Sequence, residues 1–188
     1  GGGKRKKVKE EEKEESNGNN TTTAVTANNK STPVGGKKTK KAAQTSNKKR
    51  GGGATRSYAD GSTQPLSVSS TNKFSNALLA TGFSYNRNEV GRDDNSANIA
   101  RVLPHCRDLR RLGSAELDLC LVASGQFDGY WERYLAPYDV AAGAVIVREA
   151  GGAITDFAGG NNWLFGDSVI ASNGLTHQEL RKLLSRSE

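Results

Sequence analysis

The sequence is poor in the residues that most often build thiol or histidine sites. Its 188 residues include two cysteines and two histidines. Cys106 and Cys120 are fourteen residues apart and lack the close paired spacing of a zinc site. Cys120 stands in an apolar stretch, so we expect it in the core. His105 and His177 have no acidic partner at catalytic spacing, and we expect both at the surface. Two unpaired cysteines fit a reducing, intracellular compartment.

The sequence also lacks methionine and any long apolar run. Because no apolar stretch is long enough to cross a membrane, we expect no membrane partner. The chain begins at Gly1 and shows no translation start, so we expect it to be part of a longer protein. We expect a location in the cytoplasm or a plastid, and a targeting signal ahead of Gly1 would not be visible here.

Aromatic residues are absent from residues 1–50, and apolar residues are few there. This segment holds fourteen Lys or Arg and five Glu, a net charge of +9, whereas residues 51–188 carry a net charge of −2. Such a composition cannot bury enough apolar surface to offset the entropy cost of ordering. We therefore expect residues 1–50 to be a disordered basic segment and residues 51–188 to form one domain with a core.

Two functions are open for the basic segment. Its clusters at residues 4–7 and 48–50 could contact nucleic-acid phosphates or a localisation receptor, because clustered cations gain from counterion release without needing a fold. The alternative is a solvated low-complexity segment without a partner. The absence of an aromatic residue for base stacking favours the second, so nucleic acid is not the expected partner.

Residues 51–188 alternate between short apolar runs and longer helical patterns. This alternation predicts an α/β fold, in which helices cover a parallel or mixed sheet. A capping box of Thr176 and Glu179 is expected to begin the last helix. The expected strands are residues 66–69, 78–81, 109–112, 127–131, 153–155 and 169–171, and the expected helices are residues 95–103, 115–123 and 139–150 and one from residue 176 onward.

Two acidic residues stand at the edges of these elements. The apolar helix expected at residues 139–150 follows Pro137 and ends at Gly151, so Asp139 falls in its first turn, where free N–H groups stabilise an anion. Glu132 follows the alternating strand at residues 127–131. A strand end and a helix start can direct both carboxylates into one crevice, although an acid in a first turn is also a common plain cap.

The same region resembles a known family. Residues 109–152, LRRLGSAELDLCLVASGQFDGYWERYLAPYDVAAGAVIVREAGG, are similar to the C-terminal half of inositol monophosphatase family enzymes. Further matches at residues 51–54, 68–71, 77–83 and 169–175 extend the resemblance over essentially all of residues 51–188. The family consists of magnesium-dependent, lithium-sensitive sugar-phosphate phosphatases. The resemblance therefore implies the C-terminal part of a layered αβαβα sugar-phosphatase fold.

The resemblance also implies roles for particular residues. Asp139 matches the aspartate that ligates a catalytic metal and contacts a substrate hydroxyl, and Glu132 matches the glutamate that binds the inositol hydroxyls. Gly113, Ser114 and Ala115 match a short turn whose backbone approaches the sugar. Their position at a helix start fits, because such a start offers unpaired N–H groups to a polar ligand. The implied cofactor is Mg²⁺, the implied substrate is an inositol, polyol or sugar phosphate, and the implied assembly is a homodimer.

Two departures from the family pattern limit what the chain is expected to do. Tyr138 stands where the family has Trp, and the Asp-Pro-x-Asp-Gly-Thr loop that supplies most metal ligands does not occur in this sequence. One aspartate holds Mg²⁺ poorly, because that ion requires several oxygen ligands in near-octahedral geometry. We therefore expect this chain alone to be a poor phosphatase. The alternatives are a non-catalytic remnant that binds a partner and a nucleic-acid binder acting through the basic segment.

Overall fold

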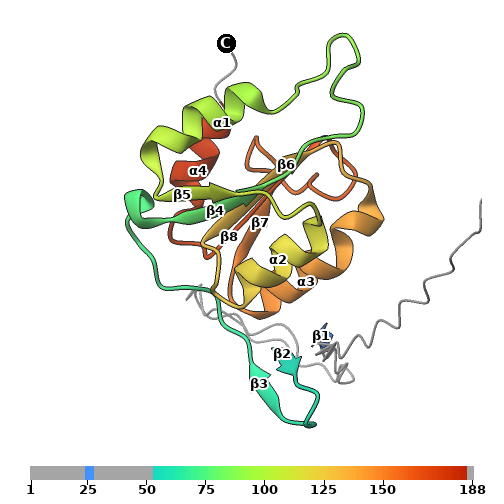
Figure 1. Cartoon of the computed structure of the whole chain (residues 1–188), viewed down its shortest axis with the longest axis vertical. Helices are drawn as coiled ribbons and strands as arrows, with labels where there is room; N and C mark the ends of the chain where they lie inside the picture. The colour runs from blue at the N-terminus through green and yellow to red at the C-terminus, as the bar shows by residue number, and fades with distance from the viewer. Residues whose placement is uncertain (1–23, 28–52, 186–188) are drawn as a thin grey trace, which may run out of the picture.

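A five-stranded mixed sheet forms the centre of the computed structural model, which describes residues 24–27 and 53–185 (Figure 1). The strand order is β5-β4-β6-β8-β7. β4 pairs in parallel with β5 and β6, whereas β8 runs antiparallel to β6 and β7. The strands are β4 (Leu78–Thr81), β5 (Asp108–Arg110), β6 (Gly129–Arg133), β7 (Ala153–Thr155) and β8 (Ser168–Ser172).

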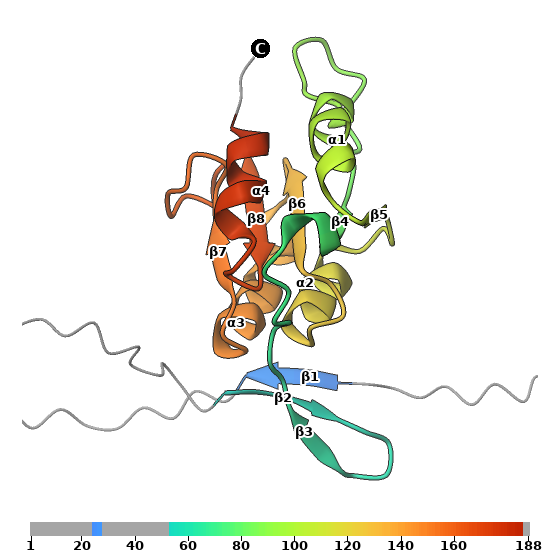
Figure 2. The ribbon, with the colours of Figure 1, turned by 90° about the vertical axis from the view of Figure 1, so that its left-hand side faces the viewer.

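Helices cover both faces of this sheet, as Figure 2 shows. α2 (Ala115–Ala123) and α3 (Ala141–Glu149) lie on one face, and α1 (Ser96–Val102) and α4 (His177–Leu184) lie on the other. Because side chains alternate along a strand, β6 sends Tyr130 into the core under α2 and α3 and Trp131 into the core under α1 and α4. The expected α/β class with helices over a mixed sheet is confirmed.

A second, smaller sheet has the order β1-β2-β3 and is antiparallel. It consists of β1 (Ala24–Ala27), β2 (Ala54–Ser57) and β3 (Thr63–Pro65). β1 belongs to the segment expected to be disordered, so for these four residues the structure departs from that expectation. The rest of residues 1–50 lies outside the described residues, and the domain boundary at residue 50 stays a prediction.

The strand expected at residues 66–69 is wrong. Leu66 N donates to Ala54 O (2.8 Å) and Val68 N donates to Ala150 O (3.1 Å). These two hydrogen bonds go to different elements, so the segment is extended but has no continuous ladder with one partner. The helix at residues 115–123 and the strands at 78–81 and 153–155 occur as expected, and the bounds of the other expected elements shift by one or two residues.

The capping box expected at Thr176 is also wrong. Thr176 precedes α4, but its Oγ1 donates to Asn173 Oδ1 (3.0 Å) instead of capping the helix. The Asn173 side-chain amide in turn donates to Ser69 Oγ (2.9 Å), and Leu78 N donates to Asp128 Oδ2 (2.7 Å). This polar cluster ties the start of β4, the start of β6 and the end of β8 together, so tertiary contacts take the hydroxyl that local capping would use.

His177 is buried, contrary to the surface position expected from the sequence, while His105 is exposed as expected. Thr155 Oγ1 donates to Asp156 O, so it accepts from His177 Nε2–H (2.9 Å). Ser172 Oγ then donates to His177 Nδ1 (2.8 Å). This arrangement satisfies a neutral imidazole.

Cys120, expected in the core, is only partly buried and packs against the core cluster under α2 and α3. No helix within residues 53–185 has the length and apolar character needed to span a membrane.

Acid is expected to destabilise the fold through His177. Burial, and then the nearby Arg181 charge, lower the pKa of this imidazole below its ordinary value. A folded-state pKa below the unfolded one contributes stability above about pH 6.5 that is lost as the pH falls further. Thermal unfolding of the chain between pH 7.5 and 5.5 measures this loss. His177→Gln should unfold at a lower temperature at pH 7.5 and show a smaller further drop on acidification, and an equal drop in both proteins would contradict the assignment.

Candidate functional site

A cleft of about 250 Å³ opens where the parallel strands β4, β5 and β6 end. Ligands of open α/β sheets bind at such strand ends. Four carboxylates and one guanidinium line the cleft, together with glycine, aromatic and small side chains. The lining residues are Gly82, Phe83, Tyr85, Arg111, Gly113, Ser114, Ala115, Glu116, Asp118, Glu132, Leu135, Tyr138 and Asp139. All five residues expected at the site from the sequence are therefore brought together.

Gly113, Ser114 and Ala115 form one wall, at the start of α2. Gly113 has a φ of 91°, a left-handed conformation that glycine adopts without strain. Ser114 is the N-cap of α2, and its Oγ accepts from Leu117 N at 3.4 Å. The ordinary capping role of Ser114 and its place in the cleft wall therefore coexist. The turn presents a helix start to the cleft, where N–H groups favour polar or anionic ligands.

Glu132 forms the floor of the cleft and is buried. It lies two residues after Tyr130 on β6, so both side chains share one face of the sheet. Tyr130 donates its hydroxyl hydrogen to Glu132 Oε2. Burial raises the pKa of Glu132, and the hydrogen bond from Tyr130 and the charge of Arg111 partly oppose that rise. The result is a carboxylate with a fixed orientation and one oxygen already partnered.

Gly82 makes room for this carboxylate. A Cβ atom at position 82 would lie 2.0 Å from Glu132 Oε2. Gly82→Ala is therefore expected to displace Glu132 and to lower the free energy of unfolding by about 1–3 kcal/mol through overpacking. Urea denaturation measures the change. In the double variant Gly82→Ala/Glu132→Ala the clashing carboxylate is gone, so adding Gly82→Ala to Glu132→Ala should cost little, and an unchanged cost would contradict the proposed clash.

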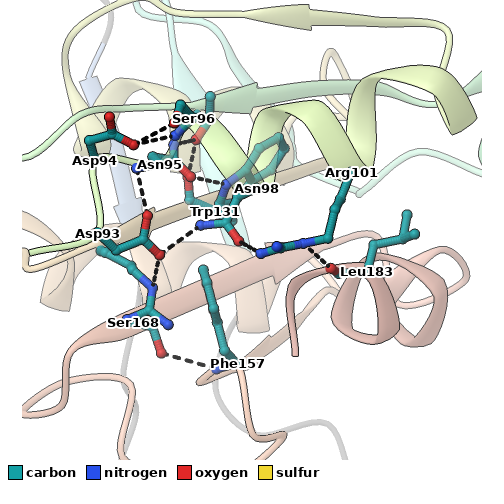
Figure 3. Close-up of polar contacts among 12 residues, drawn as sticks. Asp93, Asp94, Asn95, Ser96, Asn98, Arg101, Trp131, Phe157, Ser168 and Leu183 are labelled. Atoms are coloured by element: carbon teal, nitrogen blue, oxygen red, sulfur yellow. Dashed lines mark hydrogen bonds and ion pairs between the residues drawn. The ribbon is translucent and has the colours of Figure 1, made fainter. Parts of the chain in front are cut away.

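A polar network around Asn95 holds the ends of β4 and β6 together, and Figure 3 shows its contacts with Asp93 and Trp131. Asn95 Nδ2 donates to Thr81 Oγ1 and to Gly82 O, both at 2.8 Å, and Asn95 Oδ1 accepts from Trp131 Nε1 at 2.9 Å. Arg133 forms an ion pair with Asp93 at 3.1 Å. Because these contacts flank Gly82 and Glu132 in the sequence, they fix the backbone on which the floor of the cleft depends.

Asp139 also lines the cleft and is partly buried. The expectation that it sits in the first turn of the apolar helix is wrong. Asp139 ends a short 3-10 turn, η3 (Pro137–Asp139), and α3 begins at Ala141. Its Oδ2 accepts from Ala136 N at 3.0 Å, which is a local capping contact. The carboxylate is therefore oriented by the turn that precedes α3, while the residue still faces the same cleft as Glu132.

Sequence reasoning missed two carboxylates of the cleft, Glu116 and Asp118, which lie in the first turn of α2. Burial raises the pKa of Glu116, and the backbone N–H groups of Ala142 and Gly143 partly lower it. Asp118 is 1% exposed. Burial and the charge of Glu132 raise its pKa to about 7, against the opposing charge of Arg111. A lone aspartate within the apolar run LDLCLV is the signal that could have found it.

Among the residues that the structure describes, Arg111 is the one basic residue that lines this cleft. Its guanidinium carbon lies 5.9 Å from the centre of the Phe83 ring. The positive charge of Arg111 lowers the pKa of both Asp118 and Glu132, and it therefore opposes part of the rise that burial causes. Arg111 thus offsets part of the negative charge of the cleft and offers one attachment point for an anionic ligand.

The carboxylates of the cleft do not by themselves fit Mg²⁺. Within the part of the chain that the structure describes, no group of three or more His, Cys, Asp or Glu side chains is arranged to hold a metal ion. Mg²⁺ requires near-octahedral oxygen coordination at about 2.0–2.1 Å. Asp139 has one carboxylate oxygen beyond its contact with Ala136, so it could contribute one ligand to a site that is completed by other groups.

Comparison with known proteins identifies relatives of this fold and cleft. Residues 33–188 match the sequence profile described as the inositol monophosphatase family. The inositol-1-monophosphatase of Synechocystis is 41% identical over 132 residues, which are 70% of this chain and 46% of that protein. The Nus factor SuhB of Pseudomonas aeruginosa is 41% identical over 109 residues, which are 57% of this chain and 40% of that protein.

A solved structure agrees with these matches. The inositol monophosphatase from Anabaena superimposes with a TM-score of 0.63 at 38% sequence identity, over 70% of this chain and 54% of that one. The chain therefore spans about half the length, or less, of the proteins that it matches. The profile match begins at residue 33, ahead of the domain start expected at residue 51.

Proposed function

The chain belongs to the inositol monophosphatase family, and we propose that it supplies the polyol-binding part of a phosphatase site. The reaction that we infer is hydrolysis of an inositol, polyol or sugar phosphate. The observation that carries this proposal is the cleft at the strand ends, which gathers Glu132, Asp139 and the turn at residues 113–115. The relative from Synechocystis, which is named an inositol-1-monophosphatase, supports the same reaction.

In this proposal different side chains of the cleft bind different groups of the ligand. Glu132 accepts hydrogen bonds from polyol hydroxyls, because its carboxylate is fixed by Tyr130 and faces the cleft. Ser114 and Ala115 bring the start of α2 against the ligand, and Arg111 attracts its negative charge. Together these groups would hold the polyol phosphate in the cleft.

We propose Mg²⁺ as the cofactor, with Asp139 as one of its ligands. When bound, such an ion would polarise the phosphate and supply activated water. The remaining ligands must come from outside the described residues, because these residues lack a sufficient group. A homodimer and a location in the cytoplasm or a plastid remain proposals drawn from the family.

A second candidate is a partner-binding role without catalysis. The relative from Pseudomonas aeruginosa carries the name Nus factor SuhB, so family membership is compatible with names other than phosphatase. The incomplete metal-ligand set of the described residues also favours this candidate over independent catalysis.

Titration of the chain with inositol 1-phosphate tests the proposed binding role. We expect amide NMR shifts that concentrate at residues 113–115, 132 and 139, and that weaken in Glu132→Gln, because the amide keeps one acceptor but loses the charge. Asp60→Asn is the matched control, since Asp60 lies in the turn between β2 and β3 and is exposed. Shifts confined to other regions, or equal in both variants, would contradict the proposed cleft.

A further inference from the structure

Asp118 is a carboxylate that the binding scheme above does not use. It is 1% exposed, yet it lines the cleft, and its Oδ1 has no hydrogen-bond partner among the described residues. A buried polar atom without a partner costs about 1–3 kcal/mol. A protein keeps such a group where a ligand or an ordered water completes its hydrogen bonding. Asp118 is therefore a carboxylate at the cleft with one hydrogen-bonding position that the described residues do not fill.

The surroundings of Asp118 decide which protonation state it carries. The titratable and charged groups nearest the cleft floor are Glu132 and Tyr130 on β6, Arg111 before α2, Glu116 on α2 itself and Asp139 after β6. Three of these are carboxylates and one is a guanidinium. Tyr130 directs its hydroxyl hydrogen to Glu132 and not to Asp118. Glu132 therefore has a donor that stabilises its charge, whereas Asp118 Oδ1 has none among the described residues.

Resting on the proposed function, we propose that Asp118 is a second polyol-recognition residue of the cleft. In its uncharged acid form it donates a hydrogen bond to one ligand hydroxyl, while Glu132 accepts a hydrogen bond from a neighbouring hydroxyl. The paired donor and acceptor select a ligand with two adjacent hydroxyls, which is the chemical class of a cyclic or linear polyol.

This pairing makes the binding of a neutral polyol depend on pH. Because the pKa of Asp118 is about 7, the donor hydrogen is largely present at pH 6 and largely lost at pH 8. Affinity should therefore fall between these values by up to about fivefold, because the contribution of this one hydrogen bond is lost. Protonation of Glu132 at lower pH has the opposite effect on affinity, because the carboxylate loses the negative charge that strengthens its hydrogen bond to the ligand. A neutral ligand separates this effect from charge repulsion of a phosphate.

The experiment is an NMR titration of the full chain with myo-inositol at pH 6.0, 7.0 and 8.0. Asp118→Asn keeps an N–H donor of the same shape, so we expect affinity close to that of the unchanged chain at pH 6.0 and little change at pH 8.0. Asp118→Ala removes the donor and should weaken binding about fivefold at pH 6.0. Asp60→Asn, outside the cleft, should keep both the affinity and the pH dependence of the unchanged chain.

The outcomes separate this inference from the proposed function. If the unchanged chain binds myo-inositol but Asp118→Asn keeps the full pH dependence, or Asp118→Ala binds equally well, the inference about Asp118 is overturned alone. If no protein in the series binds myo-inositol, the polyol-binding function is overturned together with it. A purely structural role for Asp118 predicts equal pH dependence in the Asn variant, so it is distinguished from recognition.

Discussion

Asp139→Asn is expected to lower phosphate release roughly a hundredfold or more in an active enzyme that contains this chain. The charge of the carboxylate is what a metal ligand contributes, and an amide of the same shape removes it while keeping the contact with Ala136 N. A suitable enzyme joins this chain to the part of the Synechocystis inositol-1-monophosphatase that the chain does not match. Release of phosphate from inositol 1-phosphate in millimolar Mg²⁺ measures the effect.

The matched control for this prediction is Asp60→Asn in the same joined enzyme. It makes the same chemical change at an exposed turn outside the cleft and should keep the full rate. Circular dichroism of both variants checks that the fold is retained. A normal rate for Asp139→Asn would remove this residue from the proposed catalytic site.

The chain by itself is expected to release no phosphate from inositol 1-phosphate above background, even in millimolar Mg²⁺. Its described residues lack a group of three side chains that could hold a metal ion, and Mg²⁺ bound by one carboxylate keeps most of its own waters. A sensitive phosphate assay with the 188-residue chain measures this absence of activity directly. The joined enzyme described above serves as the positive control.

Robust magnesium-dependent turnover by the isolated chain would contradict that prediction. It would mean that the chain completes a metal site with residues beyond those the structure describes. An inactive joined enzyme that is folded and binds inositol 1-phosphate would instead support the partner-binding candidate. The two assays therefore distinguish an incomplete site from a role without catalysis.

Local sequence patterns predicted the elements whose structure depends on local interactions. Helix α2 has the expected bounds because Ser114 caps it and a largely apolar run follows. The segment at residues 66–69 was predicted as a strand, and this prediction failed because tertiary contacts decide its hydrogen bonding. Its N–H groups find partners on β2 and at the end of α3, which no local pattern encodes. His177 is buried for a similar reason, because its ring is held between Thr155 on β7 and Ser172 on β8, and Thr155 lies 22 residues away in the sequence.

The candidate site was predicted only where a recognisable motif marked it. Glu132, Asp139 and the turn at residues 113–115 do line one cleft, although their roles in binding stay predictions. Asp118 was missed because its importance comes from burial beside Glu132, a property of the packed sheet and helix. Gly82 was missed because its requirement arises from the position of the Glu132 carboxylate on the neighbouring strand.

A pair of magnesium titrations tests the central claim most directly, which is that Glu132 binds the polyol and Asp139 binds the metal within one cleft. The joined enzyme is assayed at saturating inositol 1-phosphate, once with Glu132→Gln and once with Asp139→Asn. The account predicts that Asp139→Asn raises the magnesium concentration needed for half-maximal rate, while Glu132→Gln leaves it nearly unchanged. A large shift for Glu132→Gln with none for Asp139→Asn would contradict the account and reverse the two roles.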